Sequence, residues 1–581
     1  MTLSPTFRNQ PETKLRADLR SRWASLLEQR EEQVFVALSL LIGALVGLAV
    51  VAFIVLTERL GMRLYPVGSA AWRRVLIPVA GSLTMGFLLY RYFPHARGSG
   101  VPQAKAALFA RDGFISLRTV LGKFFCTATT LASGIPLGRE GPSVQVGAGI
   151  ASLLGRHLGL RPEKVKALLP VGASAAIAAA FNTPMAAVLF ALEEVMGDMH
   201  APILGSVVLA SATSWAMLRL VLGNDPLFKV PLYELVSPWE FGIYAILGII
   251  GGFLSVAFTK LLLRMRQRFL LLPKKTAWWH PVVGGVVVGL IGWVVPQALG
   301  VGYGYVGEAL NGSMALKLMV VLVVLKLLGV TVSYASGNAG GIFGPSLFLG
   351  AMLGGSVGSV AHHLMPAHTA TPGAYALVGM GALFAGIVRA PMTSVLMIFE
   401  MTRDYAVIVP LMIANLTSLF ISSRFQKVPI YEALAHQDGI HLPKKEPETN
   451  QRRVWQVMGG ATETLPALLS VRQALERIGS SQFNAWPVMD EGSVVGVLRR
   501  AALTDAADNG KADHRLVDLL DSLYFPHVHV DHALHQALER MSVAQVDMLP
   551  VVSRLDTHKL EGVVTLRDVL EFYGVDPSGS A

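Results

Sequence analysis

Long apolar segments interrupted by glycine and proline are the feature that most limits how this chain can fold. Windows of about the length needed to cross a lipid bilayer occur at Val34–Leu56, Val75–Tyr90, Ile203–Leu222, Phe241–Leu263, Pro281–Val295, Leu316–Val332 and Val407–Ile421. Shorter apolar pieces such as Val144–Leu154 and Ala173–Phe181 lie between them, so we expect helices that are broken at membrane depth. Broken helices are tolerated there only where they line protein or a water-filled cavity. The pattern therefore favours a transporter or channel over a simple membrane anchor.

Composition and charge agree with a multi-pass membrane protein. Of the 581 residues, 52% are hydrophobic and only 15% are charged, whereas soluble domains carry roughly 25% charged residues. The net charge of +10 does not indicate a nucleic-acid partner, because basic residues gather beside the membrane region, at Lys14, Arg16, Arg20, Arg22, Arg30, Arg424, Lys427, Lys444 and Lys445. Positive charge next to membrane spans predicts the cytoplasmic side. We therefore expect a protein of the cell (inner) membrane with both termini in the cytoplasm.

Several kinds of site are disfavoured by the sequence. Cys126 is the only cysteine, which excludes an intrachain disulfide and a cysteine-based metal site. The adjacent pair His362 and His363 would diverge on a helix, so no metal site is expected. A long polar stretch precedes Val34, which predicts that no cleavable signal peptide is present.

The membrane region repeats itself. Two groups of motifs recur, at offsets of 207 and 203: Val171-Gly172, Pro184-Met185 and Leu192-Glu193 return as Val378-Gly379, Pro391-Met392 and Phe399-Glu400, and Gly138-x-x-Gly141-Pro142-Ser143 returns as Gly341-x-x-Gly344-Pro345-Ser346. We therefore expect two homologous halves, about 34–222 and 241–421, within a membrane domain at 33–435. Duplicated halves with interrupted helices are typical of secondary transporters, whose site lies where the halves meet.

The ends of the chain differ from this region. Residues 1–32 are expected to form a cytoplasmic segment, and a polar linker is expected at 436–453. Two similar helix–strand–strand–helix units then follow, at 454–510 and 515–575. They predict a compact α/β tandem.

Glu140 is the residue most suggestive of chemistry. It lies inside Gly138-Arg139-Glu140-Gly141-Pro142, between apolar segments, and a carboxylate at membrane depth is costly unless something useful partners it. Flanking glycines let backbone N–H groups approach the site. A helix starting near Ser143 would direct its positive end there, which suits an anion. We expect a gate that an anion and a proton both operate.

These residues resemble a known family. Three anion-site signatures of the CLC chloride channel and transporter family are matched in order, by Gly98-Ser99-Gly100-Val101-Pro102, Gly138-Arg139-Glu140-Gly141-Pro142 and Gly341-Ile342-Phe343-Gly344-Pro345. Val428-Pro429-Ile430-Tyr431 resembles the fourth contribution, and the tail resembles a tandem CBS pair. The resemblance implies an all-α polytopic membrane protein with two inverted halves of many tilted and broken helices, plus a cytoplasmic α/β CBS pair. It also implies a homodimer in the bilayer with one pore per subunit.

The resemblance also implies roles for individual residues. The chloride-binding residues would be Ser99, Ile342, Phe343, Tyr431, Gly141 and Gly344. Glu140 would be the external gate and Glu194 the internal proton acceptor. Because adjacent residues on a helix point about 100° apart, Glu193 is expected to be structural, and so is its repeat Glu400. The alternative for Glu194 is a helix-end carboxylate wetted by the cytoplasm.

Other charged residues carry weaker expectations. Lys123 and Arg139 would give electrostatic support to the anion, although Lys123 could equally snorkel toward an interface. Lys105 stands where some relatives carry an acid, which puts a proton relay on that face in doubt. In the tail, Thr565 and Asp568 resemble a ribose-binding pattern, whereas Arg499 and Ala502 break it in the first unit.

The function that follows is a chloride/proton antiporter, not an enzyme, whose substrates are chloride and protons. The alternative is a passive chloride channel gated by Glu140. An intramembrane hydrolase is disfavoured, because no serine or aspartate has a visible base or paired acid. No cofactor is expected, except that the CBS pair could take an adenine nucleotide or act as a scaffold without a ligand.

Overall fold

The computed structural model describes residues 31–64, 70–199, 203–224, 226–228, 230, 231, 233, 235–440, 452–460, 463–520 and 525–574. The chain divides into a membrane unit that ends at Pro443 and a tail unit that begins at Lys444. The expected N-terminal segment at 1–32 lies outside the described residues apart from the start of the first helix. The expected linker at 436–453 lies outside them from 441 to 451.

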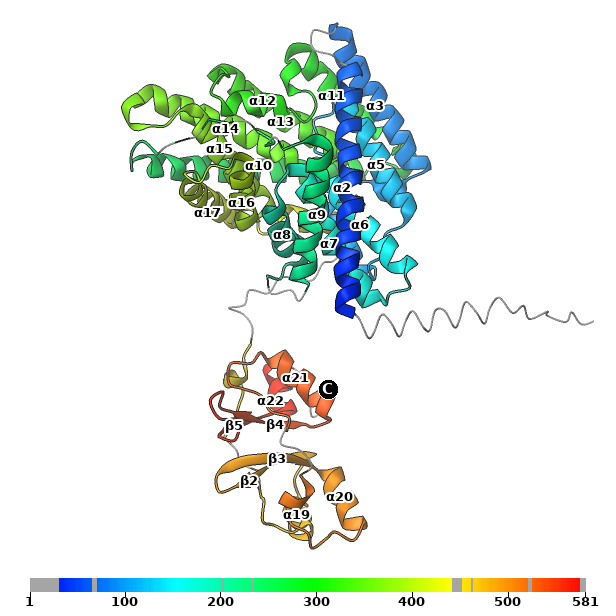
Figure 1. Cartoon of the computed structure of the whole chain (residues 1–581), viewed down its shortest axis with the longest axis vertical. Helices are drawn as coiled ribbons and strands as arrows, with labels where there is room; N and C mark the ends of the chain where they lie inside the picture. The colour runs from blue at the N-terminus through cyan, green and yellow to red at the C-terminus, as the bar shows by residue number, and fades with distance from the viewer. Residues whose placement is uncertain are drawn as a thin grey trace, which may run out of the picture. The chain divides into compact units, whose positions relative to one another are not determined.

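The membrane unit is a bundle of helices in two matching series (Figure 1). The first series is α2 (Glu31–Leu64), α3 (Ala71–Arg91), η1 (Pro94–Ala96), α4 (Val101–Ala110), α5 (Leu117–Ala132), α6 (Glu140–His157), α7 (Pro162–Phe181), α8 (Pro184–Phe190), η2 (Ala191–Met196) and α9 (Leu204–Leu222). The second is α10 (Glu240–Leu270), η3 (Lys274–Thr276), α11 (His280–Val294), η4 (Pro296–Ala298), α12 (Tyr303–Leu310), α13 (Leu316–Ser336), α14 (Phe343–Leu364), η5 (Pro366–His368), α15 (Pro372–Val388), α16 (Pro391–Thr402) and α17 (Ile408–Phe425). Helix α18 (Ile430–Gln437) closes the unit. Helices α2–α9 recur in order as α10–α17, as the internal repeat predicts.

Each of the apolar windows expected to span the membrane lies largely within one helix, namely α2, α3, α9, α10, α11, α13 or α17. The expectation of short broken pieces at Val144–Leu154 and Ala173–Phe181 is wrong. These residues belong to continuous helices of 18 and 20 residues, and α7 continues through Pro170. The break comes instead at Asn182, which adopts the left-handed conformation (φ 60°) that ends α7. Among the described residues, seven helices are long and apolar enough to cross a membrane, and they include α7 and α14 but not α3 or α11, so two of the expected windows fall short of this measure.

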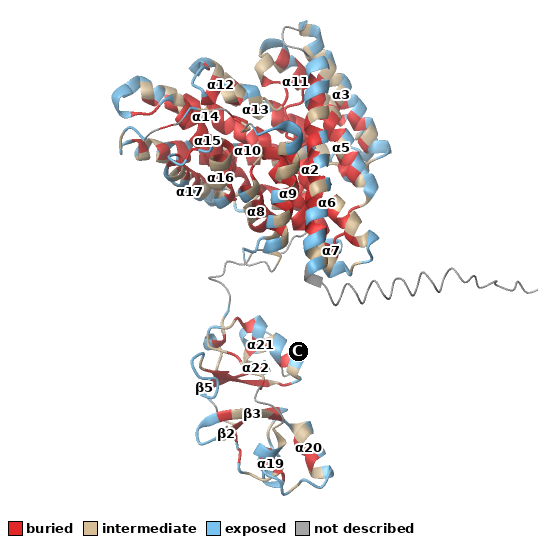
Figure 2. Ribbon diagram, in the orientation of Figure 1, coloured by how far each residue is buried: buried red, intermediate tan, exposed pale blue. Residues whose placement is uncertain are grey.

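Buried residues, red in Figure 2, fill the interior of the membrane unit, and glycines let its helices approach closely. A Cβ atom on Gly147 of α6 would lie 2.2 Å from the carbonyl oxygen of Gly172 in α7. At the corresponding place in the second half, a Cβ on Gly350 of α14 would lie 2.3 Å from the carbonyl oxygen of Gly379 in α15. Small residues let helix backbones touch inside a membrane. The same close helix contact is therefore used once in each half.

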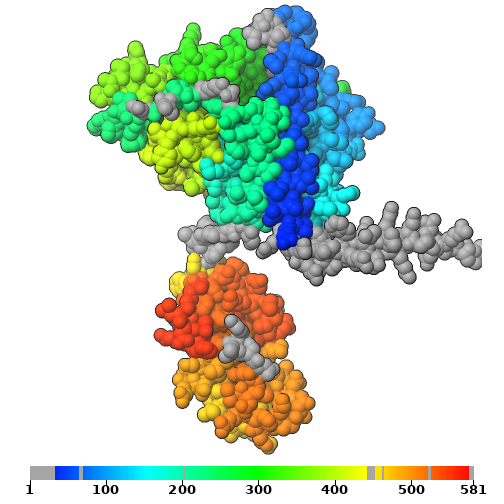
Figure 3. Space-filling view, in the orientation of Figure 1, coloured from blue at the N-terminus to red at the C-terminus, as the bar shows by residue number. Residues whose placement is uncertain are grey.

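The halves lie side by side, as the blue and green regions of the space-filling view show (Figure 3), and they meet through the glycine motifs. The backbone N–H of Gly138 donates to the carbonyl of Gly341 at 2.7 Å, and the N–H of Gly341 donates back to Gly138 at 2.7 Å. The pairing is antiparallel and joins corresponding residues. Such a pair has local two-fold symmetry, which is the relation expected of inverted repeats.

Two glutamates tie the halves together a second time. The Glu193 carboxylate accepts from the N–H and hydroxyl of Thr393 at 2.9 and 2.7 Å, at the start of α16 in the other half. Glu400 accepts from the N–H groups of Met185 and Ala186 at 3.0 and 2.7 Å, at the start of α8. Each acid caps the partner half's helix. These bonds support the structural role expected for Glu193 and Glu400.

The tail unit contains two α/β repeats. The first has η7 (Val454–Gln456), β1 (Leu465–Pro466), α19 (Val471–Arg477), β2 (Ala485–Asp490), β3 (Ser493–Arg499), α20 (Arg500–Asp508) and η8 (Leu516–Leu519), and the second has α21 (Leu534–Ala544), β4 (Met548–Val552), β5 (Leu560–Thr565) and α22 (Leu566–Phe572). Strand β1 pairs parallel to β2, while β2–β3 and β4–β5 pair antiparallel. Asn484 and Asp547 hold matching positions and bond reciprocally, backbone N–H to side-chain oxygen, at 2.8–3.0 Å. The two repeats therefore form one pseudo-symmetric body.

Candidate anion and proton site

Glu140 occupies a position that suits an anion. Its side chain is fully buried (0% exposed) at the first residue of α6. One carboxylate oxygen accepts the backbone N–H of Gly344 at 3.2 Å, and the other accepts the hydroxyl of Tyr303. Because Gly344 lies in the first turn of α14, the carboxylate sits against the positive end of a 22-residue helix.

The glycines of the two repeated motifs make room for this carboxylate. A Cβ atom on Gly138 would lie 2.3 Å from a Glu140 carboxylate oxygen, and one on Gly344 would lie 3.0 Å from it. A side chain at either position would displace the acid or the helix end. The motif therefore needs glycine for space beside Glu140.

Two hydroxyls expected to bind chloride are buried without a protein partner. Ser99 is 0% exposed and Tyr431 is 1% exposed, and neither hydroxyl oxygen has a hydrogen bond within the described residues. Ser99 directly precedes the Gly100 cap of α4, and α4 packs against α18, which carries Tyr431. Orphaned buried hydroxyls are costly unless something accepts from them. Neutral donors of this kind hold chloride without trapping it.

The start of α14 is the third expected contribution. The N–H groups of Ile342 and Phe343 belong to the first turn, where the helix itself supplies no acceptor. The Phe343 ring packs against Phe181, Phe190 and Phe384, with centroid separations of 4.8, 5.6 and 4.4 Å. This aromatic cluster fixes the helix end in place.

Gly141 belongs to the same crowded junction. A Cβ atom on Gly100 would lie 2.1 Å from the carbonyl oxygen of Gly141, and Gly100 itself has φ +106°. A Cβ atom on Gly141 would lie 2.4 Å from the carbonyl oxygen of Ser99. The motif around Ser99 and the motif around Glu140 are therefore in direct backbone contact.

Glu194 lies on a π-helical turn, η2, that follows α8. Single π turns inside α-helices often mark functional sites. Glu194 is 5% exposed, and its carboxylate pairs with Lys105 Nζ of α4 at 2.7 Å. The alternative of a wetted helix-end carboxylate does not fit this burial. Lys105 lies on α4, which packs against α18, the helix that carries Tyr431.

Lys123 is fully buried, so the expectation that it could snorkel to an interface is wrong. Its ammonium donates to the carbonyl of Ala96 at 3.1 Å and to the carbonyl of Gly98. Lys123 thus holds the loop that presents Ser99. These two carbonyls supply the hydrogen bonds that a buried ammonium needs.

Sequence reasoning missed the equivalent lysine of the second half. Lys326 is 0% exposed and donates to the carbonyls of Ala298 and Gly300 at 3.1 and 2.7 Å. The repeat offset of 203 leads from Lys123 to Lys326, so a fuller self-comparison would have found it. The two buried lysines hold matching loops.

Tyr303 was also missed, although it touches the gate candidate directly. It follows Gly300-Val301-Gly302, which repeats Gly98-Ser99-Gly100, and this repeat was the available signal. Arg139 lies over the Tyr303 ring, 5.5 Å from guanidinium to centroid, and pairs with Glu58 at 3.2 Å. Arg139 therefore contacts the ring that bonds Glu140.

In the tail, Thr565 and Asp568 are bonded to one another. The Thr565 hydroxyl donates to Asp568 at 2.6 Å and accepts the Asp568 N–H at 3.1 Å, forming the capping box of α22. Arg499 and Ala502 stand at the corresponding end of β3 and start of α20. No group of three or more potential metal ligands occurs within the described ranges.

The two helical halves bring together helix ends, unpaired hydroxyls and a buried acid. This arrangement defines a multi-pass membrane protein of the ion-transporting class. The chain belongs to the voltage gated chloride channel family, the CLC family, whose model matches residues 81–423. The CBS domain model matches residues 522–574.

Individual relatives agree with this membership. The chain is 33% identical over 372 residues to a Vibrio campbellii protein named "H(+)/Cl(-) exchange transporter ClcA", covering 62% of this chain and 79% of the relative. A crystal structure described as a slow cyanobacterial Cl−/H+ antiporter matches with a TM-score of 0.65 and 26% identity, over 70% of this chain and 97% of that one. A eukaryotic CLC transporter matches in fold, with a TM-score of 0.61 and 21% identity, over 92% of this chain and 97% of that one.

Proposed function

We propose that this protein is a chloride/proton antiporter that moves chloride across the membrane in exchange for protons. The observation that carries the proposal is the Glu140 carboxylate held by the Gly344 N–H, in a position that an anion would occupy. The names of the Vibrio campbellii relative and of the cyanobacterial structure support the same activity. The protein is then a secondary transporter, driven by gradients, and carries out no covalent chemistry.

Exchange follows from competition for one position. While Glu140 is ionised, its carboxylate occupies the outer anion position and blocks chloride. Protonation removes the charge that favours this position, so the side chain leaves and chloride enters from the central site at Ser99 and Tyr431. Since chloride and the carboxylate exclude each other, anion movement and proton binding are linked.

Glu194 is proposed to pass protons between the cytoplasm and this gate. Its burial and its π turn support that role. Against that role, Lys105 already holds the Glu194 carboxylate at 2.7 Å. This ion pair is the observation that supports the second candidate function, a passive chloride channel in which Glu194 carries no protons.

Proton flux into liposomes tests the assignment. Purified protein is reconstituted, a chloride gradient is imposed, and the voltage is held near zero with valinomycin and matched potassium. We expect uphill proton movement in the native protein. Glu140→Ala and Glu194→Gln should abolish it while chloride flux persists.

Glu163→Gln, at an exposed carboxylate near the start of α7, is the matched control and should keep full coupling. Chloride flux without proton flux in the native protein would establish the channel instead. Proton coupling that survives Glu194→Gln would remove only the assignment of that residue.

We further propose a homodimer in the inner membrane of the cell with both termini in the cytoplasm, as the basic flanks predict. The tail is proposed to act as a cytoplasmic scaffold. Adenine nucleotide at Thr565 and Asp568 is the alternative role for the tail. It is tested by the apparent melting temperature of the full protein with and without millimolar AMP or ATP, using Asp568→Ala as the control.

A further inference from the structure

Tyr303, the first residue of α12, is in direct contact with the gate candidate Glu140. Glu140 is fully buried, whereas Tyr303, whose hydroxyl contacts it, is only partly buried. Its hydroxyl donates to the Glu140 oxygen that Gly344 does not bind. The ionised gate thus has one donor from a helix end and one from a side chain.

The Tyr303 ring is held on several sides. Arg139 lies over its face, and Phe228 meets it edge-on with a centroid separation of 5.9 Å. Gly302, with φ +85°, turns the chain directly before it. A Cβ atom on Gly344 would lie 3.0 Å from the Tyr303 oxygen, so the phenol reaches the helix end itself.

The repeat explains how the phenol is placed. In the first half, Lys123 holds the carbonyls of Ala96 and Gly98, and the loop presents Ser99. In the second half, Lys326 holds the matching carbonyls of Ala298 and Gly300, and the loop presents Tyr303. The loop held by Lys123 thus carries Ser99 of the central site, while the loop held by Lys326 leads to Tyr303 at the outer site.

We infer that Tyr303 is a positioning residue that latches the ionised gate: its hydroxyl stabilises the Glu140 carboxylate in the outer anion position against displacement by chloride. The inference rests on the proposed role of Glu140 as gate. A hydrogen bond to a charged group is stronger than one between neutral groups, and the hydroxyl meets a full carboxylate charge only while the gate is closed. Loss of the hydroxyl therefore favours chloride in the competition.

Chloride affinity in a double-mutant cycle tests this. Chloride binding to the purified full-length protein is measured by isothermal titration calorimetry. Tyr303→Phe keeps the ring and removes only the hydroxyl, and we expect it to tighten chloride binding by at least threefold. In the Glu140→Ala background, where no carboxylate competes, the same change should bring no tightening.

A merely structural role for the hydroxyl predicts weaker binding, which is the opposite direction. Unchanged chloride affinity in Tyr303→Phe, or equal tightening in both backgrounds, would overturn the latch. Tyr305→Phe, on the same helix, is the matched control and should leave chloride affinity unchanged. If Glu140→Ala keeps proton coupling, the gate assignment fails and the latch fails with it. If Glu140→Ala loses coupling but Tyr303→Phe leaves chloride affinity unchanged, only the latch is refuted.

Discussion

Buried polar side chains in the membrane unit fall into two groups that behave differently on substitution. Lys105 and Glu194 satisfy one another at 2.7 Å, with side-chain exposures of 9% and 6%. Ser99 and Tyr431 have hydroxyls with no hydrogen bond to the described protein. Breaking the ion pair leaves an unpaired buried charge, whereas the unpaired hydroxyls lower stability until an anion accepts their hydrogen bonds.

Removing one member of the ion pair should cost more than removing both. Lys105→Met leaves a buried carboxylate without its cation, which costs about 3–5 kcal/mol. We expect a clear fall in the apparent melting temperature in detergent, with much of it restored in Lys105→Met/Glu194→Gln. Additive losses in the double variant would show that the two side chains do not interact.

Removing the unpaired hydroxyls of Ser99 and Tyr431 should weaken chloride binding without lowering stability. Ser99→Ala and Tyr431→Phe are each expected to weaken chloride binding by about 1–2 kcal/mol, about fivefold to thirtyfold, as measured by titration calorimetry. Neither should lower the melting temperature measured without chloride, because no protein bond is lost. Ser359→Ala, which removes a hydroxyl bonded within its own helix at 2.8 Å, serves as the control for chloride affinity. A large loss of stability without chloride would contradict the assignment.

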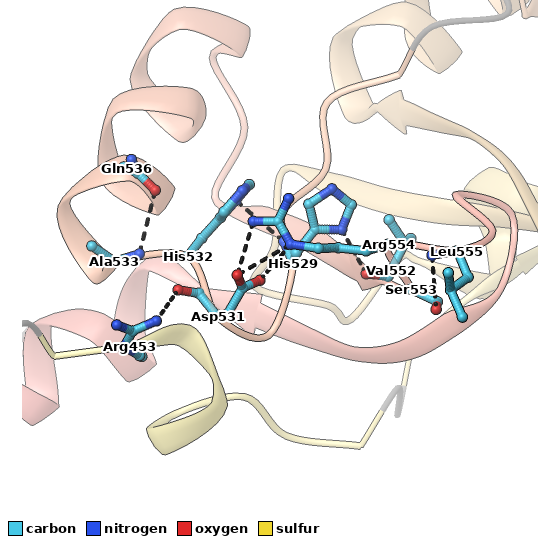
Figure 4. A network of polar contacts seen from close by, with 10 residues as sticks. All are labelled: Arg453, His529, Asp531, His532, Ala533, Gln536, Val552, Ser553, Arg554 and Leu555. Carbon is cyan, nitrogen blue, oxygen red and sulfur yellow. Dashed lines mark hydrogen bonds and ion pairs between the residues drawn. The ribbon is translucent and has the colours of Figure 1, made fainter. Parts of the chain in front are cut away.

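At the scale of helices, the two halves stabilise one another through their ends. Glu193 caps α16 and Glu400 caps α8, so the helix that leads to the π turn is fixed by an acid from the other half. The tail uses a different device. In the second repeat, Arg554 makes a bidentate contact with Asp531, which connects the loop after β4 to the loop before α21. Histidines belong to the same network (Figure 4).

Loss of either reciprocal cap should have a similar cost. Glu193→Ala and Glu400→Ala each remove acceptors from a helix start, which costs about 1–2 kcal/mol. Both should lower the apparent melting temperature by comparable amounts, whereas Glu308→Ala, at an exposed position on α12, should not. A loss in only one of the two would mean that the caps are not equivalent.

Acid should destabilise the tail through His532. Burial, aided by Arg540 and His529, lowers the pKa of His532 to about 4, and its Nδ1 accepts the backbone N–H of His529 at 3.3 Å (Figure 4). The folded state therefore keeps His532 neutral, while the unfolded chain binds a proton near pH 6.5. Stability is unaffected above about pH 7 and falls as the pH drops from about 6.5 toward 4.

Urea unfolding of a fragment comprising residues 444–581, followed by circular dichroism at pH 7.5 and pH 5, measures this effect. We expect a lower midpoint at pH 5, and a smaller difference between the two pH values in His532→Asn. The exposed His535→Asn is the control and should keep the native difference. An equal acid response in His532→Asn would assign the effect to other groups.

For the whole molecule, every residue proposed to handle chloride or protons lies before Pro443, in the membrane unit. A chain ending at residue 443 should therefore retain coupled transport in liposomes, with turnover within about twofold of the full protein and the same loss on Glu140→Ala. Loss of coupling despite a correctly folded, monodisperse truncated protein would assign the tail a direct part in transport.

Much of this architecture could be predicted from the sequence, because hydropathy and repetition report directly on helices and halves. The apolar windows lie in helices, and the offset of 207 between Glu193 and Glu400 corresponds to a pair of reciprocal caps. The continuity of α7 through Pro170 could not be predicted, because it depends on burial against neighbouring helices. The repeated glycine motif could have drawn attention to Tyr303, but its contact with Glu140 could not be predicted, and neither could that of Lys105 with Glu194, since both contacts join segments distant in sequence.

The reciprocal bonds between Gly138 and Gly341 carry a consequence for the origin of the chain. Each glycine donates and accepts one backbone hydrogen bond in the same way. Two copies of a half-length chain could therefore pair through this glycine as the two halves of the present chain do. An ancestral gene half as long could thus have encoded a working pair before duplication fused it. The two halves now differ at the site, since the first carries Ser99 and Glu140 and the second carries Tyr303.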